Sequence, residues 1–305
     1  SGGFRFDQTT VNADLNGIID IGRSEPLYVS VGAEYRKENY EIVPGEEASY
    51  ACGLANSDSS YPAVNDSSVF AECGFQAYNG LRPEASNKES RHSYAFYVNA
   101  ETLITDAWQV STALRYEDFS DAGDDIIGKL ATRYEVTDDF AVRGAISSGF
   151  RAPSLQQSAY TAYTTNLGAG GVLLQSFTAT AGSDFPSALG VDSLDLESSE
   201  NLSAGFVYNV TSDLSLTVDF YHVAIKDRIT LGSLMSADDV SFSAEAVAAL
   251  NATGAQQANY FSNSVDSTTK GVDIIASYRT DLYDGNFSAT FAGNINETEI
   301  DDVNA

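Results

Sequence analysis

The sequence predicts an all-β protein, an antiparallel up-and-down transmembrane β-barrel with short turns at one end and long loops at the other. Three observations predict this fold. Apolar and polar residues alternate along many segments, very short polar turns join these segments in pairs, and much longer polar connections separate the pairs. The long connections cover roughly 43–90, 151–198 and 230–257, well beyond the ~12–15 residues of an ordinary loop.

Alternation with a period of two places successive side chains on opposite faces of a strand. In 27–36, Leu27, Val29 and Val31 share one face, and Glu34 lies on the other. We expect about ten such strands, most of them with the ~9–11 residues that cross a bilayer. The remaining segments with this pattern are 108–117, 129–136, 202–210, 214–220, 272–279 and 287–291.

The connections are equally distinctive in their local sequence. Asp284-Gly285-Asn286 is a strong signal for a tight turn between two strands. Within the third long connection, 243–250 is rich in residues that favour a helix, so we expect a short surface helix there. The other short turns are Thr105-Asp106, Thr137-Asp138-Asp139 and Thr211-Ser212-Asp213.

The composition argues against several classes of protein. The chain has 16 Lys and Arg against 43 Asp and Glu, a formal net charge of −27. Nucleic-acid binding is not expected, because phosphate contacts need clustered basic residues. With two histidines and no G-x-S-x-G motif, the sequence offers neither a metal centre nor a catalytic triad. We therefore expect no enzyme activity, no metal and no cofactor.

The two faces of the strands distinguish a membrane barrel from a soluble β-protein. In a membrane barrel the apolar face meets lipid and the polar face lines the lumen, and a soluble module has the reverse arrangement. Aromatic residues near strand ends, such as Trp108 and Phe140, favour the membrane barrel. We expect Leu214, Leu216, Val218 and Phe220 to face lipid, with Ser215, Thr217 and Asp219 facing the lumen. The charged residues expected inside are Glu34, Arg36, Glu101, Arg115, Glu117, Lys129, Arg133, Glu135, Arg143, Asp219 and Arg279.

The only two cysteines, Cys52 and Cys73, lie in a stretch rich in Ser, Asn, Asp and Gly. This position is typical of a disulfide that closes a surface loop in an oxidising compartment. The alternative is a pair of unrelated free thiols. A zinc site would need two further ligands nearby, and the segment offers none.

Aromatic side chains stand beside polar groups in the long loops. This combination suits a sugar or a ring-bearing chelate, and the alternative is that the rings pack the loops against one another. Acidic residues between 120 and 125 allow either Ca²⁺ binding or simple solvation. The candidate ligand-contacting aromatics are Tyr50, Tyr61, Phe75, Tyr160 and Tyr163.

Four ordered motifs resemble those of TonB-dependent outer-membrane receptors. Gly149-Phe150-Arg151-Ala152-Pro153-Ser154-Leu155 is similar to the GFRAPSL segment of that family. Segments 196–201, 215–229 and 263–273 are similar to its later motifs, although Ser198 stands where the family has proline. Two interpretations of Arg151 remain open, a contact near the plug or substrate path and a structural strand end paired to a lumen carboxylate.

The resemblance implies a barrel of about 22 strands with long extracellular loops, short periplasmic turns and an N-terminal plug domain. Residues 1–305 are then expected to be a fragment of the barrel domain that lacks the plug and the final strands. The implied function is import of a siderophore, haem, cobalamin, oligosaccharide or peptide across the bacterial cell outer membrane. Implied partners are outer-membrane lipid, the small nutrient ligand, and TonB through the plug. The alternatives are a soluble β-sandwich or β-helix binding module and an outer-membrane β-barrel enzyme.

Overall fold

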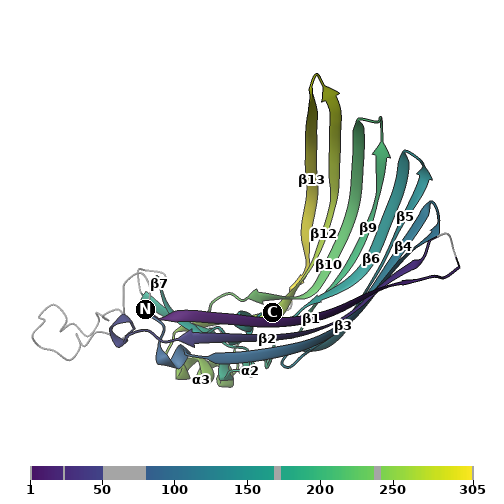
Figure 1. The fold of residues 1–305 in the computed structure, drawn as a ribbon. Coiled ribbons are helices and arrows are strands. Elements are labelled where there is room, and N and C mark those ends of the chain that lie inside the picture. The colour runs from purple at the N-terminus through teal and green to yellow at the C-terminus, as the bar shows by residue number, and fades with distance from the viewer. Residues whose placement is uncertain (1, 23–24, 51–79, 168–172, 237–241, 304–305) are drawn as a thin grey trace, which may run out of the picture.

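The computed structural model describes residues 2–22, 25–50, 80–167, 173–236 and 242–303. Long strands pair side by side, almost in chain order, into one curved antiparallel wall (Figure 1). The predicted fold class and the meander order are confirmed. The wall consists of β1 (Gly3–Ile19), β2 (Leu27–Val43), β3 (Lys88–Thr105), β4 (Trp108–Phe119), β5 (Gly123–Thr137), β6 (Phe140–Arg151), β9 (Glu197–Asn209), β10 (Leu214–Leu231), β12 (Gln257–Leu282) and β13 (Gly285–Val303).

The wall strands are longer than the predicted lengths. β4 and β6 have 12 residues each, and β12 has 26. The ladder between β2 and β3 continues to the pairing of Glu41 with Lys88, past the last alternating residue of 27–36. Apolar alternation therefore marks only the part of each strand that has an apolar face, whereas backbone pairing extends into the polar region beyond it.

The short turns, apart from 120–122 between β4 and β5, lie along one edge of the wall, and the long connections lie at the opposite end (Figure 1). The turn between β12 and β13 occupies Tyr283 and Asp284, one residue earlier than Asp284-Gly285-Asn286 indicated. Gly285 already pairs with Leu282 in the ladder, and Tyr283 takes the positive φ of 55° that closes the turn.

The long connections contain ordered elements of their own. The predicted helix at 243–250 is confirmed as α3, and the Ser243 side chain caps it by accepting a hydrogen bond from the Ala246 amide at 3.1 Å. No helix in the described ranges is long and apolar enough to cross a membrane. The loop elements are α1 (Leu155–Ala159), β7 (Ala162–Leu167), β8 (Leu173–Ala179), α2 (Asp184–Ala188), β11 (Met235–Ser236), α3 (Ala244–Ala252) and two 3-10 turns, Glu47–Ser49 and Pro83–Ala85.

One pairing among the loops departs from the antiparallel pattern. β8 runs parallel to the first residues of β12, from Gln257 opposite Ser176 to Tyr260 opposite Ala179. The expectation of antiparallel strands therefore holds for the wall and for the β7–β8 and β11–β12 pairs, but not for the pair of β8 with β12. The parallel pair arises because β8 belongs to a separate connection, which folds back onto the start of β12 instead of following it in the meander.

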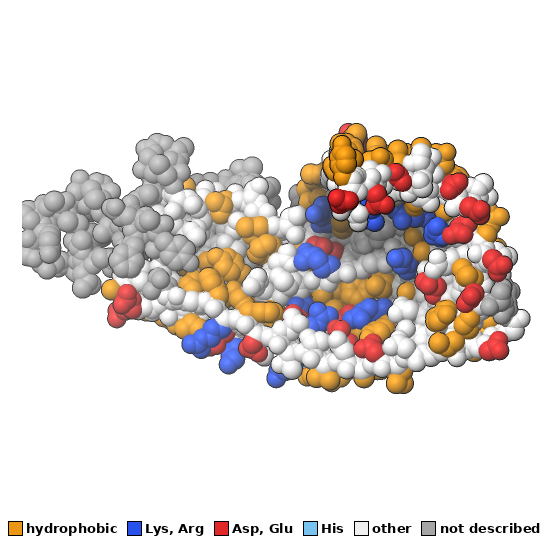
Figure 2. All heavy atoms as spheres, turned by 45° about the horizontal axis from the view of Figure 1, so that its top comes forward, with side chains coloured by type: hydrophobic (Ala, Val, Ile, Leu, Met, Phe, Trp, Pro, Cys, Tyr) orange, Lys and Arg blue, Asp and Glu red, His pale blue; other side chains and the backbone are white. Residues whose placement is uncertain are grey.

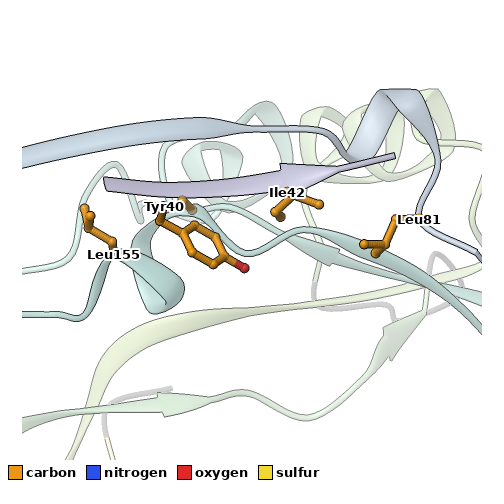
Figure 3. Close-up of a cluster of buried hydrophobic side chains, with 5 residues drawn as sticks. Tyr40, Ile42, Leu81 and Leu155 are labelled. Carbon is orange, nitrogen blue, oxygen red and sulfur yellow. The ribbon is translucent and has the colours of Figure 1, made fainter. Parts of the chain in front are cut away.

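Two apolar clusters hold the loops together. The first joins β2 to α1 and to Leu81, with the Tyr40 and Ile42 side chains buried between them (Figure 3). The second lies between α2, α3, β8 and the start of β12. Its central side chain is Phe185, which has T-shaped ring contacts with Phe242 and Tyr260 at 6.0 and 6.1 Å. The other buried members are Ala179, Ala246, Leu250 and Ala258.

Replacing Phe185 with alanine is expected to loosen this loop cluster without melting the wall. The side chain is 2% exposed, and truncating a buried phenylalanine costs ~3–5 kcal/mol. Hydrogen exchange should rise in α2 and α3 while the ladder of β3 to β6 keeps its protection. Leu234→Ala is the matched control, because this side chain is 42% exposed. It should leave hydrogen exchange unchanged both in α2 and α3 and in the wall. Equal loss of protection in the wall would contradict a separately packed loop cluster.

Candidate functional site

Charged side chains gather in the hollow of the curved wall (Figure 2). Directly opposed residues of neighbouring strands point to the same face, and the register places Arg133, Arg143 and Asp219 on this concave face. The Arg143 Nε donates to Asp219 Oδ1 at 2.8 Å across Gly205 of the intervening strand. A Cβ at Gly205 would lie 2.2 Å from that oxygen, so glycine is what allows the pair to form.

A second group of ion pairs on the same face joins β2 to β4. Glu117 binds Arg115 and Arg36, each at 2.7 Å, and Glu34 contacts both arginines at 3.3 Å. The Ser93 hydroxyl donates a further hydrogen bond to Glu117 at 3.0 Å. With its side chain 4% exposed, Glu117 is the buried centre of a network in which two carboxylates neutralise two guanidinium groups.

The convex face is apolar over the same height of the wall. The register continues this face from Leu15 through Val31 and Val98 to Leu114 on four successive strands. The side chains of this face project from the wall without other protein packed on them. The exposed large hydrophobic residues on it include Val11, Leu15, Phe96, Leu114, Ile126, Leu130, Ile146, Leu202, Phe220, Phe291 and Ile295.

The motif at residues 149–154 ends β6 where the wall meets the loops. Arg151 forms a bidentate pair with Glu197 of β9, and its Nε donates to Oε2 at 2.7 Å. Glu197 also accepts from the Ile229 amide of β10 at 2.7 Å. Ser154 then caps α1, because its hydroxyl accepts from the Gln157 amide at 3.1 Å. The motif thus ties three strands and the first helix to one rim position.

Arg91 is a buried residue at this rim that sequence reasoning missed. It donates to the Pro153 carbonyl oxygen at 2.7 Å and lies 3.2 Å from Glu38 and 3.7 Å from Asp121. Burial raises the pKa of Asp121, and the opposite charge of Arg91 offsets only part of that rise. The alternation of side chains along β3 could have predicted that Arg91 faces inward, because it lies on the same face of the strand as Tyr97.

Two of the loop aromatics that the structure describes, Tyr160 and Tyr163, contact other rings of the protein. The Tyr163 ring lies 4.7 Å from that of Phe177 in a tilted arrangement, and the Arg82 guanidinium lies 4.6 Å from its centroid. The Tyr163 hydroxyl donates to the Thr253 carbonyl oxygen at 3.0 Å. Burial raises the pKa of Tyr163. The Tyr160 ring lies 6.1 Å from that of Phe4. Tyr50 follows the first 3-10 turn and is half-buried, while Tyr61, Phe75, Cys52 and Cys73 lie outside the described residues.

The acidic residues of the β4–β5 turn and of the start of β5 do not converge. Asp121 faces Arg91, whereas Asp124 and Asp125 are consecutive strand residues and point to opposite faces. Within the part of the chain that is described, no three His, Cys, Asp or Glu residues are grouped so as to hold a metal ion.

Comparison with known proteins identifies this architecture. The family model described as TonB dependent receptor-like, beta-barrel matches residues 1–304. The siderophore receptor PirA from Pseudomonas aeruginosa has a TM-score of 0.63 and 15% identity, over 98% of this chain and 44% of that one. PirA from Acinetobacter baumannii has a TM-score of 0.60 and 16% identity, over 98% of this chain and 37% of that one. The RagAB peptide importer has a TM-score of 0.60 and 12% identity, over 99% of this chain and 31% of that one. No curated protein sequence matches.

At these identities the solved structures show the fold alone, and the chain spans less than half the length of each. Membership rests on the family model, which covers almost the entire chain. The chain belongs to the TonB-dependent receptor β-barrel family.

Proposed function

We propose that this chain forms part of the barrel wall and the loops of a Gram-negative outer-membrane receptor that imports a scarce nutrient. The observation that carries the proposal is the two-faced wall, with ion-paired charges in its hollow and unpartnered apolar side chains on its outside. This is the arrangement that hydrocarbon outside and a polar lumen inside require. A soluble β-sandwich would bury its apolar face against a second sheet. Transport would use energy that TonB transmits through a plug domain.

A ferric siderophore is the substrate class to test first. Siderophore receptors are among the solved structures with a similar fold. A peptide is the second candidate, because the RagAB peptide importer has a similar fold. Haem, cobalamin and oligosaccharides complete the test panel.

Deletion of the full-length gene should abolish growth on one nutrient of this panel when that nutrient is limiting. Under iron limitation we expect the defect with one ferric siderophore, and inactivation of TonB should reproduce it. Complementation with the intact gene is the control. A defect with peptide instead of siderophore would reassign the substrate. Normal growth of the deletion strain on every nutrient would contradict an import function.

The extracellular location implies that Cys52 and Cys73 form a disulfide within the first long loop. Closing a loop of roughly 20 residues is worth ~3 kcal/mol in the chain-entropy estimate, and the loop rather than the wall gains this stability. Mass spectrometry of protein from purified outer membranes should find a linked peptide pair that is two hydrogen atoms lighter than the two reduced peptides together. Recovery of both thiols free would refute the pairing.

A further inference from the structure

Two Lys–His pairs end the apolar stretch of the convex face on the side of the long loops. Counted from the short turns, the outward residues of β10 are apolar until His222, and those of β12 are apolar, apart from Thr280 and the hydroxyl of Tyr278, until Lys270. His222 and Lys270 lie directly opposite each other. At the other side of the wall, Lys37 of β2 lies directly opposite His92 of β3, again on the convex face and on the side of the long loops. These pairs contain both histidines and two of the five lysines in a chain of net charge −27.

The pair on β10 and β12 stands at the head of a groove on the convex face. The groove has a volume of ≈ 830 Å³ and is formed by β9, β10, β12 and β13. Below the two basic residues its walls are aliphatic and aromatic, and several of these side chains are exposed. The apolar lining residues are Leu202, Ala204, Phe220, Val272 and Ile295.

The basic groups at the head of this groove are not satisfied by the protein. Among the described residues, neither the Lys270 ammonium nor the His222 imidazole has a hydrogen-bond or ion-pair partner. Glu297 lies opposite Lys270 on β13, but it forms no ion pair with it. An ammonium group at the edge of hydrocarbon is stable only beside water or an anion. The groove therefore offers an unpaired cation above an apolar strip.

We propose that this groove binds a phosphorylated glycolipid of the outer leaflet. The phosphate contacts Lys270 and His222, and an acyl chain lies along Phe220 and Val272. The proposal rests on the outer-membrane location proposed above. The unpaired Lys270 ammonium supports it, because basic residues at a membrane interface bind lipid phosphates. Glu297 opposes this contact, so removing its charge should strengthen binding.

The test is lipid binding by the full-length protein in detergent, measured by native mass spectrometry with bisphosphorylated lipid A. EDTA is present throughout, so that a divalent cation cannot bridge phosphate to Glu297. The double variant His222→Gln/Lys270→Gln should bind about tenfold more weakly, and Glu297→Gln more tightly than the wild type. Lys226→Gln carries the same change of charge four residues further along β10 and is the matched control, with unchanged affinity.

Dephosphorylated lipid A should bind the wild type as weakly as lipid A binds the double variant. Wild-type affinity in the double variant, or equal binding of the two lipids, would overturn the proposal. Tight binding of phosphatidylglycerol would replace the glycolipid with a different anionic lipid and overturn it as well. If the double variant fails to fold, the affinity of Glu297→Gln for lipid A tests the proposal: tighter binding than the wild type supports it, and unchanged or weaker binding overturns it. Failure of the wild type to form a heat-resistant barrel in detergent would instead count against the outer-membrane function.

Discussion

Arginine in place of Leu216 is expected to destabilise the full-length receptor in a bilayer by about 2–4 kcal/mol if the position lies near the midplane. Leu216 lies opposite Tyr208 of β9 and Ala276 of β12 on the convex face. A guanidinium there has only hydrocarbon around it. Thr217→Arg should reduce the unfolding free energy much less. Thr217 lies on the same side of β10 as Asp219 and faces the concave side, which already holds Arg133 and Arg143.

The comparison is made by folding both variants into lipid vesicles and titrating them with urea. The two substitutions introduce the same side chain at adjacent residues, so each serves as the control for the other. Equal costs, or a larger cost at Thr217, would mean that the assignment of the two faces is reversed.

Removing the carboxylate of Glu117 is expected to cost about 2–3 kcal/mol of unfolding free energy. Breaking a fully buried ion pair costs ~3–5 kcal/mol, and the lower figure reflects the partial exposure of the two arginines. The side chains of Arg36 and Arg115 are 28% and 27% exposed, and in Glu117→Ala they would share Glu34 as their one remaining carboxylate.

The matched control for this variant is Glu135→Ala on the same face. Glu135 pairs with Arg133, but its side chain is 46% exposed, and surface ion pairs contribute ~0–1 kcal/mol. Urea unfolding of the full-length receptor in detergent measures the loss of unfolding free energy in each of the two variants. Similar losses for the two variants would show that the network around Glu117 is no more than a solvated surface pair.

The wall could be predicted from the sequence because side-chain alternation is a local property of each strand. Segments such as 214–220 carry large apolar residues at every second position, and the meander follows from their short turns. β1, β3 and β6 are the exceptions, because none of the predicted alternating segments lies within them. In β1 the small outward residues Ala13 and Gly17 alternate with Val11 and Leu15, so the apolar pattern is too weak to predict a strand without its neighbour.

The partners of the charged residues could not be predicted, although most of those residues could. Which carboxylate meets Arg143 depends on the register of three strands and on the missing side chain at Gly205. The same limit applies to the loops. Arg82 lies in an irregular connection, so no periodicity marked it as the cation above Tyr163. The local composition predicted α3, whereas its packing against α2 depends on contacts between different loops.

The central claim is that the convex face of this wall lies in the lipid of the outer membrane. Its most direct test is spin labelling of single cysteines introduced one at a time from Leu214 to Phe220 in the full-length receptor in bilayers. The accessibility of each label to dissolved oxygen, which concentrates in hydrocarbon, is then measured. We predict a period of two, with high values at Leu214, Leu216, Val218 and Phe220 and low values between them. Uniform values, or maxima at Ser215, Thr217 and Asp219, would contradict the claim.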